Sequence, residues 1–194
     1  MAKLYFRYGA MCSAKTMNLL AVAHNYITQG KKVLLFKPKI DTRFGDSKIT
    51  SRSGLSMDSM QIDSVSELNL FMDTLAPDKK SVDCILVDEC QFLSKEIVDE
   101  FRLITITKEI PVICFGLRTD FKTNMFPGSK RLLELADSIE EIKTTCVHCN
   151  KKALFNMRVL NGVPVVEGNQ IELGSEDKYE SVCASCWHKK LNSF

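Results

Sequence analysis

The sequence predicts an α/β fold, in which helices cover both faces of a mostly parallel β-sheet and a small module follows at the C-terminal end. Short apolar runs of strand length alternate with amphipathic segments of helical period through the first 143 residues, the pattern of repeated strand-helix-strand units. Beyond this point the alternation stops, and two close pairs of cysteines flank a segment rich in turn residues. We therefore expect one domain at residues 1–143 and a second at 144–194.

Each element follows from its local pattern. The expected strands lie at residues 3–8, 33–36, 84–87 and 112–115, and the expected helices at 16–29, 66–75 and from Ser94 onward. Gly30 closes the first helix, and Ser94 is a good N-cap for the third. The polar, glycine-bearing stretch at 41–56 predicts a loop that adds nothing to the core. Glycines and Pro164 predict turns and hairpins between the cysteine pairs.

Composition excludes several classes of partner. The net charge is only +2, with acidic and basic residues interspersed along the chain, so a nucleic-acid or anionic-membrane partner is not expected. No apolar run reaches the roughly 18 residues of a membrane span, and no signal peptide is recognisable. We expect a cytoplasmic protein, in which closely paired cysteines favour metal binding over disulfides.

The stretch GAMCSAKT, between the first strand and the first helix, predicts a phosphate-binding loop (P-loop) and hence a P-loop, RecA-like fold. Backbone N–H groups of such a loop cradle phosphates, the lysine contacts the outer phosphates, and the hydroxyl binds Mg²⁺. A chance turn would give a similar pattern, but the strand before and the helix after favour ATP binding. The expected residues are Gly9, Ala10, Met11, Cys12, Ser13, Ala14, Lys15 and Thr16.

Ala14 stands where the usual pattern has its second glycine. The donor at this position is the main-chain N–H, which alanine keeps, so phosphate binding is expected to survive. A helical backbone at Ala14 would tolerate the methyl group, whereas a positive φ would cost about 1 kcal/mol.

Two carboxylates follow the strand at 84–87. Asp88 and Glu89 lie at the carboxyl end of that strand, where open α/β sheets bind ligands. Beside a phosphate loop, Asp88 is expected to hold Mg²⁺ with Thr16, leaving Glu89 for proton transfer. The pair alone does not decide between water and a substrate hydroxyl as the phosphoryl acceptor, and an isolated pair would more often only solvate a strand end.

Two Cys-x-x-Cys pairs are the most specific geometric signal in the chain. Four thiolates suit a closed tetrahedral Zn²⁺ site without an open position for water, so the zinc is expected to be structural. Two disulfides are the less favoured alternative. The expected ligands are Cys146, Cys149, Cys183 and Cys186.

Over nearly its whole length the chain resembles the thymidine kinase family of the cellular type found in many bacteria and animals. The resemblance rests on several motifs in the right order, which are GAMCSAKT, KPKIDTRFG, SRSG at 51–54, VDECQF, FGLRTDF at 115–121 and GSEDKYESVCASC. It implies transfer of the γ-phosphoryl group of ATP to the 5′-hydroxyl of thymidine or deoxyuridine in nucleotide salvage. It also implies a homotetramer.

The resemblance also assigns site residues. Glu89 matches the catalytic base, and the segment between the cysteine pairs matches the lasso that closes over the nucleoside. Further ATP-binding positions implied are Asp41, Thr42, Arg43, Asp88 and Gln91. The nucleoside-binding positions implied are Met11, Phe121, Gln170, Ile171, Glu172, Leu173, Gly174 and Tyr179. Here Gln170 and Glu172 stand where apolar residues are common in the family.

Two other functions fit the same motifs. A P-loop ATPase carrying a zinc ribbon and acting on nucleic acid would share the loop, the acidic pair and the cysteines. It is disfavoured by the near-neutral charge and the lack of a basic, aromatic-studded groove. A zinc-bearing regulatory protein that binds nucleotide without turnover is the third interpretation.

Overall fold

The computed structural model describes residues 1–43, 45, 47–77, 81–170 and 179–191. Its central feature is a six-stranded sheet in the order β5-β2-β6-β7-β1-β8, and every neighbouring pair in it is parallel. The strands are β1 (Leu4–Tyr8), β2 (Val33–Pro38), β5 (Met60–Ile62), β6 (Cys84–Val87), β7 (Val112–Gly116) and β8 (Ser138–Glu141). The predicted parallel α/β sheet is therefore confirmed.

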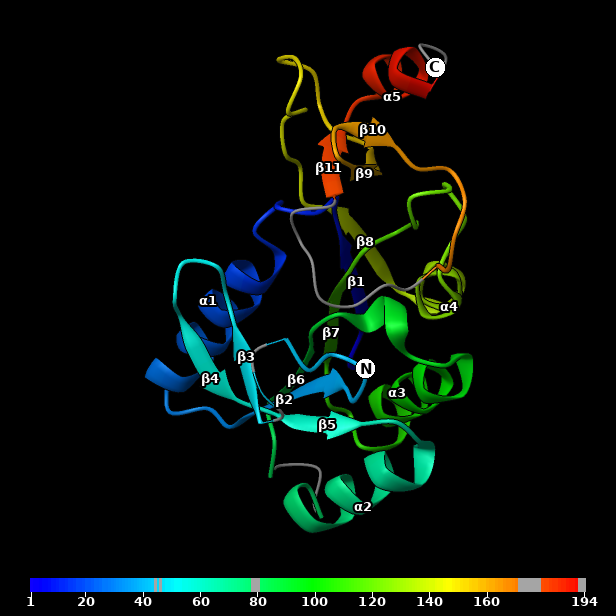
Figure 1. Cartoon of the computed structure of the whole chain (residues 1–194). Coiled ribbons are helices and arrows are strands. Elements are labelled where there is room, and N and C mark those ends of the chain that lie inside the picture. The colour runs from blue at the N-terminus through cyan, green and yellow to red at the C-terminus, as the bar shows by residue number, and fades with distance from the viewer. Residues whose placement is uncertain (44, 46, 78–80, 171–178, 192–194) are drawn as a thin grey trace.

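Helices cover both faces of this sheet (Figure 1). They are α1 (Lys15–Thr28), α2 (Val65–Leu75), α3 (Lys95–Thr107) and α4 (Pro127–Leu135). Helix α1 packs on one face, and α2, α3 and α4 pack on the other. The predicted cap of α3 is confirmed, since Ser94 Oγ accepts a hydrogen bond from the N–H of Ile97 at 3.4 Å.

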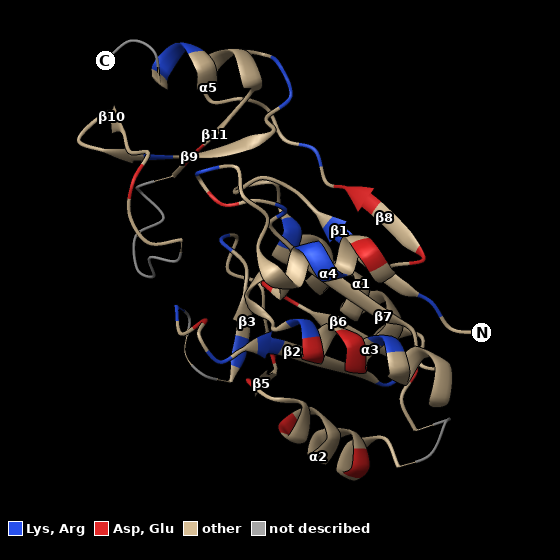
Figure 2. Cartoon of the chain, turned by 90° about the vertical axis from the view of Figure 1, so that its right-hand side faces the viewer, with Lys and Arg blue, Asp and Glu red and all other residues tan. Residues whose placement is uncertain are grey.

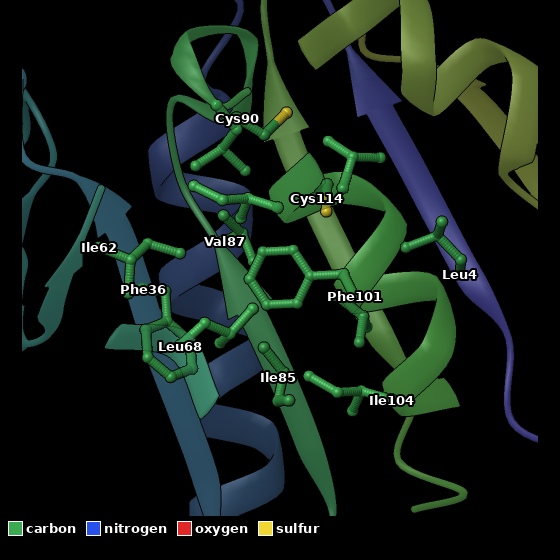
Figure 3. Packing of buried hydrophobic residues seen from close by; sticks show 14 of the residues in the cluster. Leu4, Phe36, Ile62, Leu68, Ile85, Val87, Cys90, Phe101, Ile104 and Cys114 are labelled. Atoms are coloured by element: carbon green, nitrogen blue, oxygen red, sulfur yellow. The ribbon is translucent and has the colours of Figure 1, made fainter. Parts of the chain in front are cut away.

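Alternate residues of the strands supply the two cores. In β2, Phe36 faces the cluster under α2 and α3, whereas its neighbour Leu35 faces α1. Figure 3 shows Phe36 and Phe101 packed with Leu68 and Ile85 in the first cluster. Because strands β6 and β7 are buried on both faces, they form continuous apolar runs, and this is why the sequence pattern identified them.

The C-terminal module lies beyond the carboxyl end of β1 (Figure 1). It is formed by the antiparallel strands β9 (Phe155–Leu160), β10 (Val163–Pro164) and β11 (Tyr179–Val182), followed by helix α5 (Ala184–Leu191). Its small core contains Cys146, Met157, Val182 and Cys183. Strands β9 and β10 form the expected hairpin.

The prediction that residues 41–56 form a loop without core residues is wrong. This stretch contains β3 (Lys48–Thr50) and the start of β4 (Ser56–Asp58), which pair as an antiparallel hairpin. Ile49 of the hairpin is buried against the α1 face of the sheet. Strand β5, helix α4 and strand β8 were also not predicted, because a three-residue strand and a nine-residue helix carry too little periodicity and β8 is mostly exposed rather than an apolar run.

Acidic and basic residues share the same elements, as Figure 2 shows for α3 and α4. This agrees with the interspersed charges of the sequence. Within the described residues, no helix combines the length and the apolar character needed to cross a membrane.

Candidate active site

The phosphate loop connects β1 to α1 at the carboxyl edge of the sheet. Gly9 begins it, and its N–H donates to the carbonyl of Gly116 at the end of β7 (3.2 Å). A side chain at Gly9 would lie 2.4 Å from Ser13 Oγ and 2.5 Å from the carbonyl of Ile142, so only glycine fits. The buried Lys15 folds its amine back onto the carbonyl of Ala10 (2.8 Å).

The backbone of Ala14 is left-handed, with φ 62° and ψ 28°. Of the two conformations considered for this position, the structure has the one in which the methyl group is strained. Cys12, two residues earlier, also has a positive φ of 58°. The loop therefore keeps its conformation at two non-glycine residues, each of which pays a steric penalty.

The acidic pair lies directly beside the loop. The hydroxyl of Thr16 donates to Asp88 Oδ2 at 3.0 Å, which brings together the two side chains predicted to bind Mg²⁺. Glu89 is held on both carboxylate oxygens, by Arg43 Nη2 (2.5 Å) and by Gln91 Nε2 (2.5 Å). Gln91 is itself fixed, since its Oε1 accepts the N–H of Leu117 at 3.0 Å.

The two carboxylates differ in proton affinity. Burial and, second, the adjacent charge of Glu89 together raise the pKa of Asp88 to about 7, against the opposing Thr16 hydrogen bond. Burial also raises the pKa of Glu89, but the charges of Arg43 and Lys15 outweigh this and hold it below its ordinary value. Glu89 is therefore the more readily ionised carboxylate of the pair.

Arg43 connects the predicted ATP-binding positions. Its Nε donates to Asp41 Oδ1 at 2.7 Å while its Nη2 contacts Glu89. Both carboxylates are largely buried, with side-chain exposures of 8% for Asp41 and 12% for Glu89. Because Arg43 follows β2 and Glu89 follows β6, this contact depends on the neighbouring positions of the two strands in the sheet.

These residues line one cavity of about 340 Å³, a size that suits a small-molecule site. It brings together most of the predicted site, namely Met11, Cys12, Ser13, Ala14, Lys15, Thr16, Asp41, Arg43, Asp88, Glu89, Gln91, Phe121, Gln170 and Tyr179. Gly9, Ala10 and Thr42 are not among its lining residues. The predicted positions Ile171, Glu172, Leu173 and Gly174 lie outside the described residues.

The predicted nucleoside-binding side of the cavity is formed by loop and module residues together. Phe121 is buried, and the guanidinium of Arg158 lies 5.4 Å from its ring centroid. Gln170 Nε2 donates to Asp120 Oδ2 at 2.9 Å, which links the module to the segment that carries Phe121. Tyr179, at the start of β11, also lines the cavity.

Sequence reasoning missed several residues here. Asn156, Thr119 and Asp120 line the cavity, and Ser181 contacts the phosphate loop through the carbonyl of Met11 (2.5 Å). Asn156 and Ser181 lie in short strands where a polar residue has no distinctive local pattern. Thr119 and Asp120 lie inside the FGLRTDF motif, and Ser181 lies inside the GSEDKYESVCASC motif, so these two motifs were the available signals.

The four predicted metal ligands converge. The sulfur atoms of Cys146, Cys149, Cys183 and Cys186 all lie within 4.8 Å of one another. Two of the sulfur-to-sulfur distances are 3.6 Å and 3.7 Å. Tetrahedral sulfur ligands at the usual Zn–S bond length of about 2.3 Å would lie about 3.8 Å apart. The donor set and its spacing therefore fit a closed four-thiolate metal site, and the disulfide alternative is disfavoured because all four are free cysteines.

The surroundings favour thiolate at part of this cluster. Burial raises the pKa of Cys146, but N–H groups of Cys183 and His148 donate to its sulfur and the pKa falls to about 6. The Cys186 thiol instead shares its proton with neighbouring sulfurs, which raises its pKa to about 12. A bound cation would displace that remaining proton.

The fold and the cavity define a nucleotide-binding protein of the P-loop α/β class, with an acidic pair beside the phosphate loop. The family model for thymidine kinase matches residues 2–187. The chain belongs to the thymidine kinase family.

Curated relatives agree over nearly the full length. The thymidine kinase of Enterococcus faecalis is 47% identical over 183 residues, covering 94% of this chain and 93% of that protein. The thymidine kinase of Chromobacterium violaceum is 46% identical, covering 97% and 99%. Among solved structures, a Pif1 helicase from Candida albicans aligns with 73% of this chain and 36% of its own, at a TM-score of 0.44 and 10% identity.

Proposed function

We propose that the chain transfers the γ-phosphoryl group of ATP to the 5′-hydroxyl of thymidine, and also of deoxyuridine, with Glu89 as the general base. The observation that carries this proposal is the position of Glu89, an ionised carboxylate in the same cavity as the phosphate loop and Phe121. Membership of the thymidine kinase family supports the substrate pair.

The donor side of the cavity fits a triphosphate. The loop offers backbone N–H groups and the amine of Lys15, whose present partner is a carbonyl of the loop itself. Ser13 Oγ is buried and, within the described part of the chain, has no hydrogen-bond partner. A phosphate oxygen would satisfy that hydroxyl, because a buried polar group without a partner is costly.

Mg²⁺ fits beside the loop. Thr16 and Asp88 provide a hydroxyl and a carboxylate, the hard oxygen ligands that this ion prefers. The raised pKa of Asp88 is the expected property of a buried carboxylate without a cation partner. When bound, the ion would neutralise charge on the phosphates and bring Asp88 to its ionised form.

The proposed reaction is an in-line displacement. Glu89 accepts the proton of the 5′-hydroxyl as that oxygen bonds to the γ-phosphorus, while the bond from the γ-phosphorus to the β–γ bridging oxygen breaks and ADP leaves. Arg43 has two possible partners, because the guanidinium that holds Glu89 also lines the cavity and could donate charge-assisted hydrogen bonds to a phosphoryl oxygen. We infer that Arg43 turns toward the phosphates when ATP binds and so releases one oxygen of Glu89.

The acceptor side is proposed to bind the nucleoside between Phe121, Tyr179 and Met11, with the segment from Gln170 to Gly174 contributing main-chain groups. A frame of hydrogen bonds rejects bases that leave its buried groups unpaired. Zn²⁺ at the four cysteines would anchor both ends of this segment, so that residues 144–194 act as a lid that excludes water. A homotetramer in the cytoplasm, acting in nucleotide salvage, completes the proposal.

The test is nucleoside-dependent ADP formation from Mg-ATP, with thymidine, deoxyuridine, deoxycytidine or no nucleoside. Wild type is compared with Glu89→Gln and with Glu140→Gln, a matched change at an exposed carboxylate that pairs with Arg7 on the sheet edge. We expect turnover with thymidine and deoxyuridine alone, reduced about 10²–10⁴-fold in Glu89→Gln and retained in Glu140→Gln.

Other outcomes would overturn the proposal. Turnover that ignores thymidine and rises with single-stranded DNA would indicate the ATPase. ADP formation at background level in wild type and Glu89→Gln alike would indicate a nucleotide-binding regulatory protein.

A further inference from the structure

Both peptide groups of Met11 are held by the C-terminal module. The N–H of Met11 donates to Asn156 Oδ1 at 2.7 Å, and the carbonyl of Met11 accepts the hydroxyl of Ser181 at 2.5 Å. The residues joined by these two contacts are 145 and 170 positions apart in the sequence. One residue of the phosphate loop is thus tied to two strands of the module.

The two side chains form a single unit. Asn156 on β9 and Ser181 on β11 are direct partners in the antiparallel register, so they project from the same face of the small sheet. Both are buried, with relative exposures of 4% and 3%. The amide nitrogen of Asn156 donates to the carbonyl of Thr119 (3.3 Å), which fixes its oxygen toward Met11.

The held residue lies at the point where the loop is strained. Cys12, next in the chain, and Ala14 both have left-handed backbones without being glycine. Conformations of this kind persist only where the surroundings determine them. Ala14 makes no side-chain cap hydrogen bond of its own. Asn18 Nδ2 donates to its carbonyl at 3.0 Å, and Arg52 Nη1 contacts Cys12 Sγ at 2.9 Å. The two contacts at Met11 add main-chain hydrogen bonds directly before this strained segment.

We propose that Asn156 and Ser181 are positioning residues for ATP, which act by holding Met11 and so keeping the phosphate loop in its binding conformation. The C-terminal module then serves the donor side of the site as well as the nucleoside side. This inference rests on the proposed use of ATP, but it does not depend on which acceptor receives the phosphoryl group.

The test measures binding of the Mg²⁺ complex of a non-hydrolysable ATP analogue by calorimetry, without nucleoside. Ser181→Ala removes the donor to Met11 and should weaken binding about five- to tenfold, the factor that corresponds to one hydrogen bond. Ser181→Thr keeps the hydroxyl and should retain most of the affinity. Thr105→Val deletes an equally buried hydroxyl that bonds a carbonyl at 2.7 Å within α3, away from the cavity, and should change binding less than twofold.

A role confined to general stability is distinguished by rescue. Ala14→Gly relieves the strain that the contact is proposed to hold, so in the Ser181→Ala background it should recover about threefold or more of the lost affinity, a non-additive effect. In steady state, Ser181→Ala should raise KM for ATP and leave kcat within about threefold.

Three outcomes would overturn the inference. These are analogue binding within twofold of wild type in Ser181→Ala, an equal loss in Thr105→Val, or no recovery with Ala14→Gly. If Ser181→Ala does not fold, Asn156→Ala removes the acceptor of the Met11 N–H and is expected to give the same loss and the same rescue. Normal analogue binding in a wild type that ignores thymidine would refute the proposed function and leave this inference standing.

Discussion

Replacing Ala14 with glycine should make the protein more stable. The left-handed backbone of Ala14 costs an L-residue about 1–2 kcal/mol, a penalty that glycine does not have. Glycine also gives the unfolded chain more freedom, which offsets about 0.4–1 kcal/mol of this gain. We therefore expect Ala14→Gly to raise the free energy of unfolding by about 0.5–1 kcal/mol.

The same alanine-to-glycine change inside helix α1 should have the opposite effect on stability. Ala21 is exposed like Ala14, but it lies within α1 at an ordinary helical position. Ala21→Gly should lower the free energy of unfolding by about 0.5–1 kcal/mol, because glycine is a poor helix former. Both variants lose a methyl group, so the difference between their free energies of unfolding reports the effect of the backbone conformation alone.

The assay is urea unfolding followed by far-ultraviolet circular dichroism, at one protein concentration and without ligand. Affinity for the Mg-ATP analogue should stay within about threefold in Ala14→Gly, because the main-chain N–H of residue 14 is the donor in both proteins. Equal destabilisation by both variants would refute the assignment of strain to Ala14. A hundredfold gain in affinity would show instead that the methyl group obstructs the phosphate site.

Three further predictions concern the metal, the ion pair and pH. Cys183→Ser should reduce bound zinc from about one per chain to well under one, measured by elemental analysis; an unchanged content would exclude the four-cysteine site. Arg43→Met should lower thymidine-dependent kcat about 10²-fold or more, since it removes a charge from beside Glu89 and the phosphates; activity within threefold of wild type would contradict this role. Burial raises the pKa of Asp137, but hydrogen bonds from the N–H of Leu4 and from Arg102 outweigh burial and lower the pKa. The ionised Asp137 therefore stabilises the fold above the ordinary pKa of about 3.9, and this stabilisation is lost as the pH falls through the lower pKa of the folded protein. Asp137→Asn should therefore lower the free energy of unfolding by about 1 kcal/mol at pH 7, with the gap closing in acid; a gap that persists at low pH would refute the charge argument.

Part of the fold could be predicted because it depends on local pattern. Strands β6 and β7 are buried on both faces, so their residues form unbroken apolar runs. The edge strand β8 has the sequence SIEE and is mostly exposed, and nothing in its composition distinguishes it from a loop. It is a strand because β1 offers it an unpaired edge.

The hairpin at 48–58 was missed for a related reason. Its strands are three residues long, and Ile49 is the single residue of β3 that reaches the core. A single apolar position cannot reveal the alternating pattern by which a strand is predicted from sequence. Only the packing of α1 and the neighbouring strand ends made that position an interior one.

The sequence by itself determined the local patterns from which the candidate site is built. The order of glycine, lysine and threonine in the loop, the adjacent Asp88 and Glu89, and two cysteine pairs of equal spacing are local patterns, and each was found in the structure at its expected place. Local spacing is sufficient there because a strand-to-helix turn or a metal knuckle is built from consecutive residues.

The tertiary structure alone decided how those parts act on one another. Arg43 meets Glu89 because β2 and β6 are neighbours in the sheet. Asn156 and Ser181 meet Met11 because the small sheet lies over the phosphate loop. Contacts between residues distant in the chain depend on how whole elements pack, and a hydrogen bond of this kind leaves no periodic signal in the residues that make it.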